Sequence, residues 1–112
     1  MYVKILRYRV LPEQLQAFLE IQRRAAEIYR MHLPAETRYF QSSDDPAVWI
    51  EVHRYGDREA FLAVSQRLQH DPVVRRLWQE FQATLDPQYP GSIEQYEERP
   101  LGPSDGRGES FG

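Results

Sequence analysis

The most promising set of chemically active side chains lies in one short segment, VWIEVHRY, at residues 48–55. Glu51, His53 and Tyr55 alternate along this segment, so in an extended strand they share one face at intervals of about 6.5–7 Å. A histidine can accept a proton near neutral pH, and a neighbouring carboxylate can orient it. The spacing therefore predicts a catalytic pair, with His53 as the base and Glu51 as its partner. A hydrogen-bonded histidine in a subunit interface is the alternative.

Several aromatic residues are candidates for binding a planar ligand, and all of them lie in segments that read as strands. The four predicted substrate-binding residues are Tyr8, Trp49, Tyr55 and Tyr96. Aromatic side chains combine a large apolar surface with a polar atom, which suits a ligand pocket and a packed core equally well. The sequence leaves both interpretations open.

The histidines give no sign of a metal centre. His32, His53 and His70 are widely spaced, and the chain contains no cysteine. Neither a zinc-thiolate site nor a cysteine nucleophile is therefore possible. A glycine-rich phosphate loop is also absent, because the first glycine of the chain is Gly56. We expect neither a metal ion nor a cofactor.

These candidates depend on a regular alternation of strands and helices. Hydrophobic periodicity and turn residues predict the order β-α-β-β-α-β. Asp57 is placed to cap the second helical region, and Asp71-Pro72 interrupts and restarts it. The strands are expected at residues 2–10, 36–42, 47–55 and 92–99, and the helical regions at 12–32 and 57–85.

This order predicts an α+β fold of the ferredoxin-like type. Its four-stranded antiparallel sheet would carry the helices on one face. Residues 1–100 are expected to form a single domain. Residues 101–112, LGPSDGRGESFG, are rich in glycine and are expected to be a flexible C-terminal tail.

The alternation within residues 48–55 also predicts which side chains face the helices. Val48, Ile50 and Val52 form an apolar side that we expect to pack against them. The side that carries His53 would then face away from the helices. A row of large amphipathic side chains is unusual in bulk water, so a second copy of the chain is expected to cover it. The sequence thus predicts a homodimer with the candidate site near the interface.

Composition narrows the range of partners. The chain has 112 residues and a formal net charge of −3, which does not favour nucleic acid as a partner. Its apolar runs are far shorter than the ~20 residues of a membrane span. We therefore expect a cytoplasmic protein whose partners are a second copy of itself and a small aromatic or apolar ligand.

The pattern resembles a known superfamily. Four features resemble the dimeric α/β-barrel superfamily. They are the order β-α-β-β-α-β, the charged aromatic segment 48–55, the following DREAF at 57–61 and the interrupted helix QHDP at 69–72. The closest parts are similar to its antibiotic-biosynthesis-monooxygenase branch and to its NIPSNAP- and EthD-like relatives, over residues 1–99.

This resemblance implies a dimeric α/β barrel and a monooxygenase-like enzyme that acts on a small molecule in the barrel cavity without a cofactor. A non-catalytic ligand-binding or structural dimeric module is the alternative. The haem-degrading branch is disfavoured, because it carries an asparagine on the first strand and this chain has no asparagine.

Overall fold

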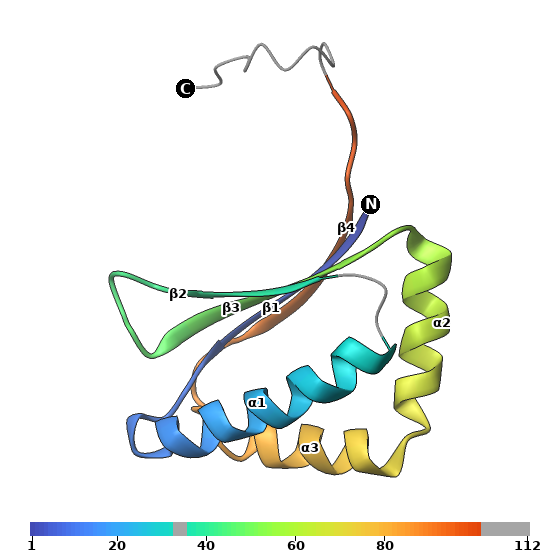
Figure 1. The fold of residues 1–112 in the computed structure, drawn as a ribbon. Coiled ribbons are helices and arrows are strands. Elements are labelled where there is room, and N and C mark those ends of the chain that lie inside the picture. Colours follow the sequence, from blue (N-terminus) through green and yellow to red (C-terminus); the bar gives the residue numbers. More distant parts are fainter. Residues whose placement is uncertain (33–35, 102–112) are drawn as a thin grey trace.

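The protein, described here from a computed structural model, folds in the predicted order of elements (Figure 1). The structure describes residues 1–32 and 36–101. The predicted flexible tail therefore lies, apart from Leu101, outside the described residues. The strands are β1 (Tyr2–Arg9), β2 (Thr37–Gln41), β3 (Val48–Tyr55) and β4 (Ser92–Glu97), and the helices are η1, a 3₁₀ turn (Pro12–Gln14), α1 (Leu15–His32), α2 (Arg58–Gln69) and α3 (Pro72–Gln82).

The four strands form one antiparallel sheet in the order β2-β3-β1-β4. The helices lie against one face of this sheet, and no other element of residues 1–32 and 36–101 covers the opposite side, the open face (Figure 1). The predicted ferredoxin-like α+β fold is confirmed.

Two aspartates fix where the second and third helices begin. The side chain of Asp57 accepts a hydrogen bond from the backbone N–H of Ala60 at 2.7 Å, and Asp71 accepts one from Val73 at 2.9 Å. Pro72 follows as the first residue of α3, where its missing N–H costs nothing. The chain turns at this break, so that α3 runs alongside α1 while α2 lies across their far end (Figure 1).

The helix-facing side of the sheet is buried in two separate apolar clusters. The larger cluster consists of Leu6, Tyr8, Val10, Phe18, Ile21, Leu77 and Phe81, and the smaller of Tyr2, Tyr55, Phe61 and Val64. In the register of β1 with β3, Lys4 pairs with His53 and Leu6 with Glu51. The polar side chains of β3 therefore lie between the two apolar clusters, under the helices.

The predicted orientation of strand β3 was wrong. Glu51 and His53, only 4% and 5% exposed, face the helices, whereas Val52 and its alternate neighbours face the open side of the sheet. The reason is the pairing with β1, whose helix-facing side chains include the buried Leu6 and Tyr8. Side chains paired directly across an antiparallel ladder share a face, so this register carries Glu51 inward.

Candidate functional site

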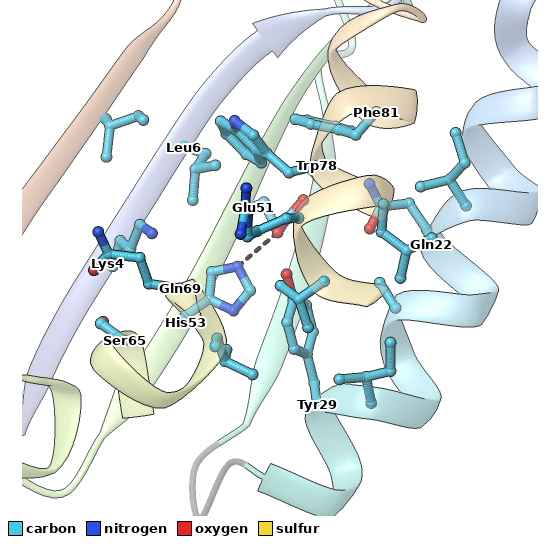
Figure 2. A pocket seen from close by; sticks show the side chains of 18 of the residues that line it. Lys4, Leu6, Gln22, Tyr29, Glu51, His53, Ser65, Gln69, Trp78 and Phe81 are labelled. Carbon is cyan, nitrogen blue, oxygen red and sulfur yellow. Dashed lines mark hydrogen bonds and ion pairs between the residues drawn. The ribbon is translucent and has the colours of Figure 1, made fainter. Parts of the chain in front are cut away.

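A cavity of about 500 Å³ lies between the sheet and the three helices. This volume falls within the ~300–1,000 Å³ range of small-molecule sites. Strands β1 and β3, with Ile93 of β4, form its floor, and α1, α2 and α3 form its walls (Figure 2). Apolar side chains such as Leu6, Trp78 and Phe81 make up much of the lining, and a few polar groups converge within it.

The central polar group is the pair formed by Glu51 and His53. Its Oε2 and Nε2 atoms are 2.6 Å apart (Figure 2). The hydroxyl of Tyr8 donates to the other carboxylate oxygen of Glu51 at 2.8 Å, and the hydroxyl of Thr37 lies 3.0 Å from Nδ1 of His53. An ionised carboxylate only accepts, so the Nε2–H of His53 donates to Glu51 in this state. Nδ1 of a neutral His53 then accepts from Thr37.

Four tyrosines surround the carboxylate of Glu51. Burial, and then the negative charge of Glu51, raise the pKa of Tyr55 to about 12. The same two causes raise the pKa values of Tyr8, Tyr29 and Tyr39 well above the ordinary range. All four phenols stay protonated at neutral pH. The phenols that respond to Glu51, the only acid that the structure describes in the cavity wall, are therefore neutral, and the hydroxyl of Tyr8 donates to its carboxylate.

Two further contacts hold this arrangement. The ring of Tyr29 lies edge-on to His53, with 5.3 Å between the ring centroids. The hydroxyl of Tyr39 donates to Gln22 on α1 at 2.8 Å, which ties β2 to the wall of the cavity. The histidine is thus fixed on one side by an aromatic edge and on two others by hydrogen bonds.

The structure brings together four of the six residues predicted for the site. Glu51, His53 and Tyr55 line the cavity, and Tyr8 reaches it through its bond to Glu51. The sequence placed them on the face opposite to the helices, so the grouping is present but on the other side of the sheet.

The other two predicted residues lie elsewhere. Trp49 packs its ring 5.2 Å from that of Phe18, and its buried Nε1 has no partner within residues 1–32 and 36–101. Tyr96 pairs with Val3 on the open face of the sheet, where it is 50% exposed and its hydroxyl contacts Glu94. Neither side chain lines the cavity.

Sequence reasoning missed several residues that do line the cavity. They are Lys4, Gln22, Tyr29, Ser65, Gln69 and Trp78, all of which point toward the space in Figure 2. One signal could have identified Lys4. It is the single lysine of the chain, and it occupies an inward position of β1 between Tyr2 and Leu6, which are both buried.

The described part of the chain contains no group of three or more His, Cys, Asp or Glu side chains arranged to hold a metal ion. None of its helices is both long and apolar enough to span a bilayer.

Comparisons with known proteins give similarity in structure only. No protein-family model and no curated protein matches the sequence. A solved structure described as an antibiotic biosynthesis monooxygenase superposes with a TM-score of 0.71 at 19% identity, covering 89% of this chain and 100% of its own.

Two other solved structures are similar to the same extent. An uncharacterised NIPSNAP domain protein from Burkholderia xenovorans has a TM-score of 0.71 at 19% identity, over 92% of this chain and 99% of its own. SnoaB, a cofactor-independent oxygenase from Streptomyces nogalater, has a TM-score of 0.70 at 12% identity, over 89% and 94%. The resemblance to these two groups of proteins is thereby confirmed at the level of the fold.

Proposed function

We propose that the cavity is an active site in which Glu51, held by His53, removes a proton from a small and largely apolar substrate. The removal would begin a cofactor-independent, monooxygenase-like reaction. The observation that carries this proposal is the 2.6 Å contact between a carboxylate and an imidazole in a cavity of about 500 Å³. The cofactor-independent oxygenase among the structurally similar proteins supports the choice of reaction by analogy of fold.

The occupied hydrogen-bonding positions favour Glu51 as the direct proton acceptor. Both ring nitrogens of His53 already have partners, Glu51 and Thr37. A carboxylate offers about four acceptor positions, and Tyr8 and His53 take up two of those on Glu51. His53 then acts as a positioning residue. The sequence had suggested the reverse, with His53 as the base and Glu51 as its partner.

The reaction can be written in full for an enolisable ketone with an acidic CH₂ group. The proton passes from carbon to a carboxylate oxygen of Glu51, and the C–H electron pair becomes the enolate. Dioxygen, the second substrate, adds to the enolate carbon and forms a peroxide, and Glu51 returns the proton. Loss of water from the hydroperoxide leaves a second carbonyl, so one ketone and one O₂ give one diketone and one water.

Anthrone tests this proposal, because it is planar, apolar and carries one acidic CH₂. Hydrogen–deuterium exchange of this group, followed by NMR under nitrogen, measures proton removal alone, and dioxygen uptake measures the whole reaction. We expect Glu51→Gln to lower both rates by about 10²–10⁴-fold. Glu94→Gln, which removes a carboxylate from the open face of β4, is the matched control and should leave both unchanged. Equal exchange by Glu51→Gln and the wild type would reject the proposal.

The positioning role of His53 has its own test. His53→Gln keeps an N–H donor that can reach Glu51, whereas His53→Leu keeps none. We expect the glutamine variant to recover part of the exchange rate that the leucine variant loses. If the two variants exchange deuterium at the same rate, the hydrogen bond to Glu51 does not serve the reaction.

One observation favours a non-catalytic ligand-binding module as the second candidate. Every nitrogen and oxygen of the Glu51–His53 pair already contacts a protein group, as in a packed structural network. Such a module would bind anthrone without accelerating its exchange. The exchange measurement therefore also decides between the two functions.

We further propose that the protein is a homodimer through the open face of the sheet. The apolar side chains on this face include Val3, Ile5, Ile50 and Val52, with Phe40 52% exposed beside them. An apolar face of this kind is typical of an interface. The cavity would then lie outside the interface, one in each subunit. Location in the cytoplasm stays a prediction of the sequence.

A further inference from the structure

Lys4 is the one ammonium group at the floor of the cavity. It lies on the helix-facing side of β1, directly across the ladder from His53. Burial lowers the pKa of Lys4, and the negative charge of Glu51 only partly offsets that effect. No side-chain hydrogen bond to another described residue contributes to this balance. The amine is thus partly withdrawn from water without a dedicated partner among residues 1–32 and 36–101, which leaves its donors available to a ligand.

The charges around the cavity favour an anion. Among the described residues of the wall, Lys4 and Arg75 are cations and Glu51 is the only acid. The carboxylate of Glu51 is already engaged by Tyr8 and His53. Positive charge therefore exceeds negative charge in a space of low polarity, where electrostatic interactions are stronger than in water.

Several polar side chains gather near Lys4 at one end of the cavity, and two large aromatic side chains lie at the other. Ser65 and Gln69 are one helical turn apart on α2, so they share a face, and that face lies near Lys4 (Figure 2). Trp78 and Phe81 project from α3 at the other end, with 5.4 Å between their ring centroids. The space is thus amphipathic, with an amine, a hydroxyl and an amide at one end and aromatic rings at the other.

We propose that the cavity binds an amphipathic organic anion, whose charged oxygen contacts Lys4 and whose apolar body lies against Trp78 and Phe81. This inference rests on the proposed function for the identity of the site and adds the class of ligand. In the proposed reaction, the charged oxygen is the enolate oxygen that forms when Glu51 takes the proton. The negative charge then passes from Glu51 to a ligand atom beside Lys4. Lys4 is thereby a specificity-determining residue for acidic ligands.

A pair of matched probes tests the preference for an anion. 2-Naphthoate and 2-naphthamide have the same aromatic body and nearly the same shape, but only the first is charged. Their dissociation constants are measured by titration calorimetry. We expect the wild type to bind naphthoate about tenfold more tightly than naphthamide, a difference of ~1.4 kcal/mol.

The test variant is Lys4→Met, which keeps the length of the side chain and removes its charge. It should lose the preference for naphthoate. Arg7→Met is the matched control, since Arg7 lies on the same strand, faces the open side, and changes the net charge equally. The control should keep the preference. A Lys4→Met protein with the wild-type ratio of affinities, or a wild type that binds no naphthoate at millimolar concentration, would overturn the inference.

The single lysine permits a second measurement. Protein labelled with ¹³C at the ε-carbon of lysine gives one side-chain NMR signal, that of Lys4. Its titration should show a pKa below 10.5 in the free protein, a higher pKa with naphthoate, and no change with naphthamide. The groups that face or adjoin this amine are Glu51 and His53 from β3, Gln95 from β4, and Ser65 and Gln69 from α2. Bound naphthoate that leaves the titration of Lys4 unchanged would also overturn the inference.

The Glu51→Gln variant separates this inference from the proposed reaction. Removing a negative charge near Lys4 should let the variant bind naphthoate at least as tightly as the wild type, even though its proton exchange is lost. Preference for naphthoate without any anthrone exchange would support the anion site and reject the reaction. Anthrone exchange without that preference would support the reaction and reject the anion site.

Discussion

The two faces of strand β3 differ in a way that is opposite to the usual arrangement of a sheet. The face under the helices carries Glu51 and His53, which are almost completely buried, while the face without helices carries Ile50 and Val52. Burial of a charged side chain costs free energy unless hydrogen bonds replace the lost water. Here Tyr8 and Thr37 supply those bonds. The polar inner face underlies the proposed site in the cavity, and the apolar outer face underlies the proposed dimer.

The largest expected effect comes from removing one member of the buried pair. His53→Leu leaves the carboxylate of Glu51 without its 2.6 Å partner, and the free energy of unfolding should fall by about 3–5 kcal/mol. The double variant Glu51→Leu/His53→Leu replaces both groups with apolar ones and should recover most of the loss. Urea denaturation of the two variants measures both changes.

The opposite face of the same strand provides the control. Arg54 forms exposed ion pairs with Glu36 at 3.0 Å and with Glu98 at 3.4 Å. Because exposed pairs contribute little, Arg54→Leu should lower the free energy of unfolding of the monomer by less than about 1 kcal/mol. Equal losses in the free energy of unfolding for Arg54→Leu and His53→Leu would show that the polar groups on the inner face are no more important for stability than those on the outer face.

Much of the architecture could be predicted because its signals are local. Asp57 and Asp71-Pro72 mark helix starts through side-chain and backbone groups within three residues of each other. The orientation of β3 could not be predicted in this way, because both of its sides carry large apolar or aromatic groups. It is decided by the register with β1, a non-local pairing in which Lys4 lies opposite His53.

In the candidate site, too, local contacts could be predicted from the sequence and non-local contacts could not. The spacing of Glu51 and His53 on one strand was visible, and the structure confirms that the two side chains lie together. Their bonds to Tyr8 and Thr37 join residues 43 and 16 positions apart along the chain. No local pattern reveals such contacts, so the enclosure of the pair under the helices emerged only from the fold.

An intermediate effect is expected on the outer face. Ile50→Glu places a charge in the apolar side of β3 and should convert the proposed dimer to a folded monomer, because an unpaired charge is costly in a buried interface. Light scattering at micromolar concentration measures the mass, and circular dichroism verifies the fold. Leu62→Glu on α2, where the leucine is 45% exposed away from the sheet, should leave the mass unchanged. A wild type that is already monomeric would reject the interface.

The smallest expected effect is a change in the free energy of unfolding at alkaline pH, through Tyr55 on the inner face. The pKa of Tyr55 is raised to about 12 in the folded protein, from 10.0, first by burial and then by Glu51. The folded state therefore holds this proton more tightly than the unfolded state does. The resulting stability is fully present below pH 10 and is lost as the pH rises through about 12.

Tyr55→Phe should accordingly show a weaker decline in unfolding free energy across this interval than the wild type. Urea denaturation at a series of pH values measures the slope. Glu51→Gln removes the second cause of this shift, and it acts in the same way on Tyr8, Tyr29 and Tyr39, so it should also flatten the curve. Identical slopes for Tyr55→Phe and the wild type would show that the inner face does not hold this phenol protonated.

The break at Asp71-Pro72 has a consequence for how the proposed ligand site can change. The break assigns the two ends of the cavity to separate helices, with Ser65 and Gln69 on α2 and Trp78 on α3. Each helix has its own aspartate cap, so each begins independently of the other. Substitutions on α3 can therefore reshape the aromatic end of the cavity while the residues of α2 stay unchanged. In the proposed site, selection can vary the contacts to the body of the ligand and those to its charged group one at a time.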